Sequence, residues 1–167
     1  MNAFSVRWPV IFMREIVGTP DRNAFVAKDL RAVCTVINSH FLWFEATLLP
    51  PRVIDFTTTW CIWCTRQEPQ VVDLHKKYES KGFTVIAIDC NEPRETVLSK
   101  YPGGTNLYPV VLDLDGNVSR NQYGVQGFPF YLLVDKTGKV AYVQSGFKED
   151  MFKSVSKIID YLMDKEP

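Results

Sequence analysis

Two cysteines separated by two residues are the part of this 167-residue chain best suited to chemistry. Cys61 and Cys64 lie in the stretch "TTTWCIWCTRQEP", residues 57–69. A pair with this spacing can cycle between dithiol and disulfide, supply half of a zinc site, or form a structural crosslink. A structural zinc site needs four ligands. The other cysteines and histidines occur singly, with no metal-site spacing: Cys34, His40, His75 and Cys90.

The redox interpretation is therefore favoured, and no metal site is expected. A crosslink between Cys61 and Cys64 closes so short a loop that it would restrain the unfolded chain little. We expect Cys61 to lie at the N-terminus of a helix, where unpaired N–H groups and the helix dipole favour a thiolate. Cys61 is then the predicted nucleophile. Cys64, shielded one turn further into the helix, is the thiol expected to resolve the mixed disulfide.

Alternating strand and helix signals predict the elements that would position this pair. Two β-rich runs, 52–56 and 83–89, flank a predicted helix over 64–78. Later elements are a helix after Asn91, a strand at 108–113, hairpin strands at 130–134 and 139–144, and an amphipathic helix over 149–164. Within the first fifty residues, 16–30 could hold a loop and a strand, and 34–44 another strand. The expected fold class is α/β, a mixed sheet with helices packed on it.

Composition narrows the classes of partner. Hydrophobic residues make up 46% and charged residues 23%, which is ordinary globular usage. Lysine plus arginine and aspartate plus glutamate each total 19, so no positive field favours nucleic acid or an anionic membrane. The most apolar longer stretch, 32–50, carries Asn38, His40 and Glu45, so no membrane span is predicted. The apolar run 10–13 is too short for the core of a signal peptide.

Two quoted stretches carry a family resemblance. "VIDFTTTWCIWC" followed by Pro69, together with "GVQGFPFYLLVDKTGKV", resembles the thioredoxin superfamily over about residues 51–164. Within it, the chain resembles the TlpA/ResA-like thiol–disulfide oxidoreductases, because the separation of 65 between Cys64 and Pro129 (129 − 64) is longer than a minimal thioredoxin requires. The resemblance implies a thioredoxin-like three-layer α/β/α fold with a mixed central sheet. A helix and strand at 91–113 would be inserted before a cis-proline at Pro129.

The same resemblance implies one domain and one kind of activity. Residues 1–167 would form a single thioredoxin-like domain, with its core at 51–164 and an N-terminal extension at 1–50. It would exchange disulfides with protein substrates and with a dithiol protein that donates or accepts electrons. A monomer without a cofactor is expected, since both electrons reside on the two sulfurs. Relatives of this type act mostly outside the cytoplasm, on the periplasmic or outer membrane face, although no signal peptide is visible.

The residues around the pair have expected roles in binding substrate. Trp60, Ile62 and Trp63 offer a hydrophobic surface beside the cysteines. By resemblance, Pro129 lies against the disulfide and exposes the backbone of Phe128, which could pair with an extended substrate segment. Such a cis bond costs only about 0.5–1 kcal/mol over trans.

Two positions that bear on proton transfer, 67 and 55, distinguish this chain from the group. Where TlpA/ResA-like proteins commonly have a glutamate, three places after the second cysteine, this chain has Gln67. Asp55, however, lies six residues before Cys61, where thioredoxin has its buried aspartate. We hypothesise that Asp55 is desolvated, has a raised pKa and accepts the proton of Cys64. The alternative is a partly exposed aspartate at the end of a strand.

Two other functions stay open at this point. One is a peroxide-reducing, peroxiredoxin-like relative, although "DFTTTWC" lacks the Pro-x-x-x-Thr-x-x-Cys context of that group. The other is a non-catalytic binding module whose cysteines hold metal or are vestigial. Cys34 and Cys90 are predicted to be small core residues. The direction of electron flow is not predicted.

Overall fold

The computed structural model describes residues 15–17, 50–101 and 107–164. Its strands are β1 (Glu15–Val17), β2 (Arg52–Thr57), β3 (Thr84–Cys90), β4 (Val110–Asp113), β5 (Phe130–Val134) and β6 (Val140–Ser145). Its helices are α2 (Ile62–Tyr78), α3 (Arg94–Lys100) and α4 (Met151–Asp164), with short helical turns η1 (Glu79–Lys81) and η3 (Val118–Gln122).

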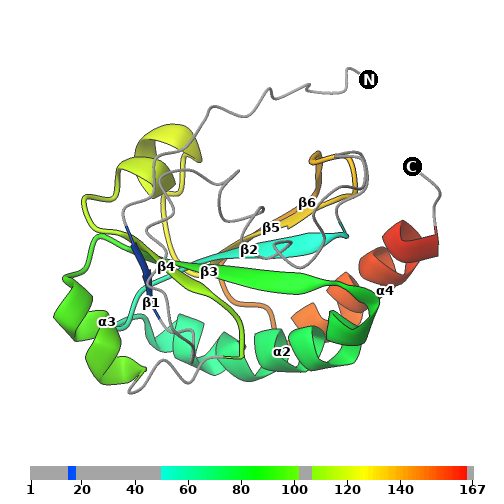
Figure 1. Cartoon of the computed structure of the whole chain (residues 1–167), viewed down its shortest axis with the longest axis horizontal. Coiled ribbons are helices and arrows are strands. Elements are labelled where there is room, and N and C mark those ends of the chain that lie inside the picture. The colour runs from blue at the N-terminus through cyan, green and yellow to red at the C-terminus, as the bar shows by residue number, and fades with distance from the viewer. Residues whose placement is uncertain (1–14, 18–49, 102–106, 165–167) are drawn as a thin grey trace, which may run out of the picture.

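The described strands form one mixed sheet in the order β1-β4-β3-β2-β5-β6. Strands β2, β3 and β4 are parallel, whereas β1, β5 and β6 each pair antiparallel with a neighbour. Helices α2 and α4 lie along one face, and the turn η3 lies on the other (Figure 1). This arrangement is the expected three-layer α/β/α fold. Helix α3 and strand β4 occupy the expected insertion before Pro129.

The central strands are apolar on both sides because both faces are covered. Alternate residues of β2 enter different cores: Val53 packs on the side of α2 and α4, and Phe56 on the side of η3. On α4, Met151, Val155 and Ile159 are buried at intervals of four, which places one apolar stripe against the sheet. The sheet is thus held from both sides, with β2 and β3 at its centre.

The predicted elements are confirmed, with shifted ends. The hairpin strand 130–134 matches β5, and the helix predicted from residue 64 begins two residues earlier, at Ile62. The π-helical turn η3 was not predicted. Strand β1 coincides with the predicted loop and strand over 16–30 only at residues 16 and 17. The strand predicted over 34–44, with Cys34 and His40, lies outside the described residues. No helix of the described ranges is long and apolar enough to cross a membrane.

Candidate active site

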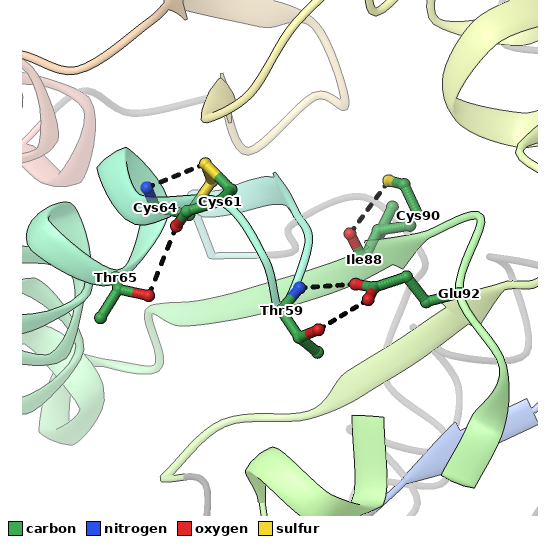
Figure 2. The surroundings of a disulfide bond; sticks show 7 residues. All are labelled: Thr59, Cys61, Cys64, Thr65, Ile88, Cys90 and Glu92. Carbon is green, nitrogen blue, oxygen red and sulfur yellow. Dashed lines mark hydrogen bonds between the residues drawn. A yellow bond between two sulfur atoms is a disulfide. The ribbon is translucent and has the colours of Figure 1, made fainter. Parts of the chain in front are cut away.

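Cys61 lies where the central strand gives way to the first helix of the core. Strand β2 ends at Thr57, a short turn follows, and Cys61 is the N-cap of α2 with an extended backbone. Cys61 and Cys64 form a disulfide with their Cα atoms 5.2 Å apart (Figure 2). The backbone N–H of Cys64 donates to Cys61 Sγ at 3.0 Å. The sulfur of Cys61 therefore lies at the positive end of a 17-residue helix that has no acidic residue in its first turn.

The disulfide is covered, and the residues around it are exposed. Cys61 and Cys64 are 5% and 4% exposed, whereas Trp60, Ile62 and Trp63 are 70%, 75% and 49% exposed. In this oxidised form, the exposed fraction does not distinguish the attacking from the resolving sulfur. The two cysteines differ in their positions on α2, because Cys61 caps the helix and Cys64 lies inside it. Large apolar side chains in water beside a covered disulfide are typical of a surface that binds another molecule.

Two further aromatic side chains, Phe128 and Phe147, extend this surface. We call the whole surface the aromatic rim, and it consists of Trp60, Ile62, Trp63, Phe128 and Phe147. The rings of Trp60 and Phe128 meet edge to face with centroids 6.2 Å apart. Those of Trp63 and Phe147 are 5.4 Å apart. The Phe128–Pro129 peptide bond is cis, which confirms the prediction, and Pro129 O accepts a hydrogen bond from Gly146 N at 2.8 Å. Phe147 was missed because it lies far along the chain, between β6 and α4.

Asp55 is buried in the centre of the sheet. It lies opposite Ala87 of β3 and Tyr131 of β5. Burial, reinforced by the nearby Glu68 carboxylate, raises the pKa of Asp55 to about 8, while Lys100 opposes the shift. Its Oδ1 atom has no hydrogen-bond partner among the described residues. The predicted burial and raised pKa are confirmed, and the alternative of a partly exposed strand-end aspartate is wrong.

Two acids, one near the end of β3 and one just after it, complete the polar surroundings of the cysteine turn, and the sequence analysis did not single them out. The Glu92 carboxylate accepts hydrogen bonds from Thr59 N and from Thr59 Oγ1, the latter at 2.6 Å (Figure 2). Asp89 is buried nearby, and burial together with the Glu92 charge raises the pKa of Asp89 to about 8. Glu92 thus fastens the turn two residues before Cys61. Adjacent parallel strands end at the same edge of a sheet, and this rule could have drawn attention to "DCNEP".

Gln67, at the place of the family's glutamate, is fully buried, and both the nitrogen and the oxygen of its amide form hydrogen bonds. Its Nε2 donates to Lys148 O at 3.1 Å, and Lys148 N donates to its Oε1 at 2.9 Å. Both halves of the amide are therefore used to join α2 to the segment before α4. The side chain has a structural role and no free group for proton transfer.

Cys90 is a core residue, as predicted. It is buried, its Sγ donates to Ile88 O at 3.2 Å, and burial raises the pKa of its thiol far above the ordinary range. A thiol in that state is unreactive at neutral pH. No group of three or more metal-ligating side chains is found in the part of the chain that the structure describes.

The segment that carries this geometry, from β2 to α4, matches a known family. The family model described as Redoxin matches residues 51–159. The chain belongs to the Redoxin family. A thiol-disulfide oxidoreductase ResA of Geobacillus thermodenitrificans is 33% identical to this Redoxin-family chain over 108 residues, which cover 63% of the chain and 61% of that relative.

Solved structures agree on the fold. A thioredoxin-like protein from Porphyromonas gingivalis has a TM-score of 0.68 at 19% identity, covering 96% of this chain and 94% of that one. A thiol:disulfide interchange protein of the thioredoxin family from Chlorobium tepidum TLS has a TM-score of 0.61 at 21% identity. The alignment covers 95% of this chain and 99% of that one. This Redoxin-family chain is a TlpA/ResA-like member of the thioredoxin superfamily, as the resemblance indicated.

Proposed function

We propose that this chain is a thiol–disulfide oxidoreductase that exchanges disulfides with protein substrates through Cys61 and Cys64. The observation that carries the proposal is the disulfide at the N-terminus of α2, with Cys61 Sγ accepting the N–H of Cys64. The match to a ResA protein supports it, although the chain spans only 61% of that relative's length.

The proposed reaction is two successive thiol–disulfide exchanges. In the reduced protein, the Cys61 thiolate attacks one sulfur of a substrate disulfide, forming a mixed disulfide and releasing the other substrate sulfur as a thiolate. Cys64 then loses its proton and attacks Cys61, which releases the second substrate sulfur. The substrate disulfide has gained two electrons, and the Cys61–Cys64 disulfide has formed. No cofactor is needed, because both electrons come from the two sulfurs.

Asp55 is the proposed acceptor of the Cys64 proton. Its buried carboxyl has an Oδ1 atom without a hydrogen-bond partner among the described residues. No hydrogen bond found among the described residues joins Asp55 to either cysteine. The proposed proton transfer therefore passes through an intervening water molecule. A carboxyl with a pKa near 8 can both take up and return a proton at neutral pH.

The aromatic rim is the proposed binding surface for the substrate. Trp60, Ile62 and Trp63 surround the disulfide, and Phe128 leads into the cis Pro129. An extended substrate segment lying along this surface would pair with the backbone at Phe128 and bury its apolar side chains against the indoles. We propose that the protein works as a monomer and that a second dithiol protein restores its redox state.

Trapping the mixed disulfide tests the proposal. The reduced Cys64→Ser variant should accumulate a covalent complex with a disulfide-containing model protein, because Cys61 can attack but nothing resolves the complex. Cys61→Ser should accumulate none, and the double variant controls for Cys90. Equal complex formation by Cys61→Ser and Cys64→Ser would contradict the assigned roles. Turnover of hydrogen peroxide without any disulfide substrate would favour the peroxide-reducing alternative instead.

The direction of electron flow follows from one further measurement. Equilibration of the 61–64 pair with glutathione gives its reduction potential, which is about −270 mV in thioredoxin and −120 mV in the strong oxidant DsbA. A value near the first would make the protein a reductant of its partners. A value near the second would make it an oxidant.

A further inference from the structure

Arg66 lies at the border of the aromatic rim. It follows Trp63 by three residues on α2, so the two side chains project from the same face of the helix. The guanidinium carbon lies 5.7 Å from the ring centroid of Trp63 and 5.1 Å from that of Phe147. One cation is therefore held over two rings that come from α2 and from the segment before α4.

The charge of Arg66 is not neutralised by the described protein. No ion pair found within residues 50–101 and 107–164 involves Arg66. Stacking on aromatic faces uses the plane of a guanidinium and leaves the N–H groups at its edge free to donate. Lys148 adds a second exposed cation next to Phe147 in sequence, and its Nζ donates to Tyr142 OH at 3.2 Å. Arg66 and Lys148 thus place two cations with hydrogen-bond donors at the border of the rim.

The position of Arg66 on α2 gives its axial separation from the reacting sulfur, which is the component that matters for a segment lying along the helix. Arg66 follows Cys61 by five residues, which corresponds to about 7.5 Å along a helix axis. An extended chain advances about 3.3 Å per residue, so the same distance spans about two or three residues of a bound segment. A carboxylate at that place on the substrate would receive parallel N–H donors from the guanidinium.

We propose that Arg66, held over Trp63 and Phe147, selects protein substrates that carry an acidic side chain two or three residues from the reactive cysteine. This inference rests on the proposed function, because it describes the partner of the same site. The substrate class is an extended segment that combines an apolar stretch for the rim with a carboxylate for the guanidinium. A neutral or basic segment lacks that contact and docks more weakly.

Matched peptides test this selectivity. Each peptide carries one cysteine in a disulfide with a chromogenic thiol, and members of a set differ only in Glu, Gln or Lys placed two or three residues before or after the cysteine. The rate constant for cleavage by the reduced protein is measured at low and high ionic strength. For at least one placement, we expect the Glu peptide to react about fivefold faster than the Gln peptide at low salt, with the Lys peptide slowest. High salt should reduce the ratio, because the pair is exposed.

The variants separate this proposal from the proposed function. Arg66→Gln should bring the Glu-to-Gln ratio close to one, and Arg66→Lys should keep part of it. The control Lys76→Gln, which removes an exposed cation further along α2, should keep the full ratio. Equal rates for Glu and Gln peptides in the unaltered protein, or a ratio that survives Arg66→Gln, would overturn the role of Arg66 while leaving disulfide exchange intact. Cleavage of no peptide at all would overturn both.

Discussion

Cys61 and Cys64 differ in their backbone surroundings more than in their exposure. Both side chains are nearly covered, yet only Cys61 has its sulfur at the helix N-terminus, where the N–H of Cys64 points at it. A thiolate gains more from such a donor than a thiol does, so the site favours ionisation of Cys61. Burial has the opposite effect on Cys90, whose pKa it raises. We therefore expect Cys61 to be the reactive cysteine, because of the N–H at its sulfur, and Cys90 to be unreactive, because of its burial.

Replacing Asp55 by asparagine tests the proposed proton acceptor. Asp55→Asn should slow the resolution of a preformed Cys61 mixed disulfide at pH 7 by about tenfold or more, because an amide cannot accept the Cys64 proton. In the unaltered protein this rate should rise with pH through the pKa of about 8 and level off about one pH unit above it, as the carboxyl ionises. Release of the substrate thiol in stopped flow measures the step. The exposed Asp73→Asn on α2 is the matched control, and an unchanged rate in Asp55→Asn would remove Asp55 from the mechanism.

At the scale of elements, α2 must stay fixed so that its N-terminus remains beside the end of β2. Two glutamine side chains fasten it to the beginning of α4. The Gln67 amide exchanges two hydrogen bonds with the backbone of Lys148, and Gln70 Oε1 accepts from Phe152 N at 2.9 Å. At the other side, Glu92 holds the turn that precedes Cys61 through Thr59. These contacts come from segments far apart in sequence, and they set the position of the cysteines.

Replacing Gln67 by glutamate tests this attachment. Gln67→Glu restores the family's acid but places a carboxylate oxygen against Lys148 O, where an N–H now donates. We expect unfolding free energy to fall by about 1–3 kcal/mol at pH 8, and by less at pH 5, where a protonated carboxyl can still donate. Denaturant unfolding at both values measures the loss. The exposed Gln126→Glu is the control, and equal stability of Gln67→Glu and the unaltered protein at pH 8 would contradict the account.

Elements with a regular pattern could be predicted, and those held by distant partners could not. The alternation of buried strands with α2 and α4 was visible as apolar runs and stripes. Turn η3 has no such pattern: it is held by the Asp113 carboxylate, which accepts the N–H groups of Val118 and Ser119. Strand β1 is only three residues long and is defined by its antiparallel pairing with β4. The roles of Glu92 and Phe147 likewise depend on contacts that sequence spacing does not reveal.

For the whole molecule, we propose that the chain forms one domain whose core spans residues 51–164. Among the buried carboxyls of its sheet are Asp55 on β2, opposite Ala87, and Asp89, two residues further along β3 and opposite Thr57. A carboxyl whose pKa is raised by folding binds more protons in the folded state than in the unfolded one. Its contribution to stability is complete below the unfolded pKa near 4 and is lost as pH rises through the folded pKa near 8.

This linkage predicts an unusual loss of stability in mildly alkaline solution. Between pH 6.5 and 8, unfolding free energy of the oxidised protein should fall by about 2–3 kcal/mol, since each raised carboxyl contributes up to about 1.4 kcal/mol per pH unit. His75, whose pKa is lowered by burial, adds stability with rising pH only below about 6.5, the ordinary value. Denaturant midpoints across this range measure the slope. Asp55→Asn with Asp89→Asn should flatten it, and a flat profile in the unaltered protein would contradict the raised pKa values.

We propose that Cys61 of the reduced protein is held at the N-terminus of α2 as an anion ready to exchange with Cys64. The most direct test of this proposal is the pH dependence of alkylation of the reduced protein by iodoacetamide, with the modified cysteine located by mass spectrometry. We predict that Cys61 reacts first, with an apparent pKa well below the ordinary value of about 8.5, and that mild oxidation abolishes its labelling by joining it to Cys64. Labelling of Cys61 no faster than an ordinary free thiol, with no disulfide formed on oxidation, would contradict the account.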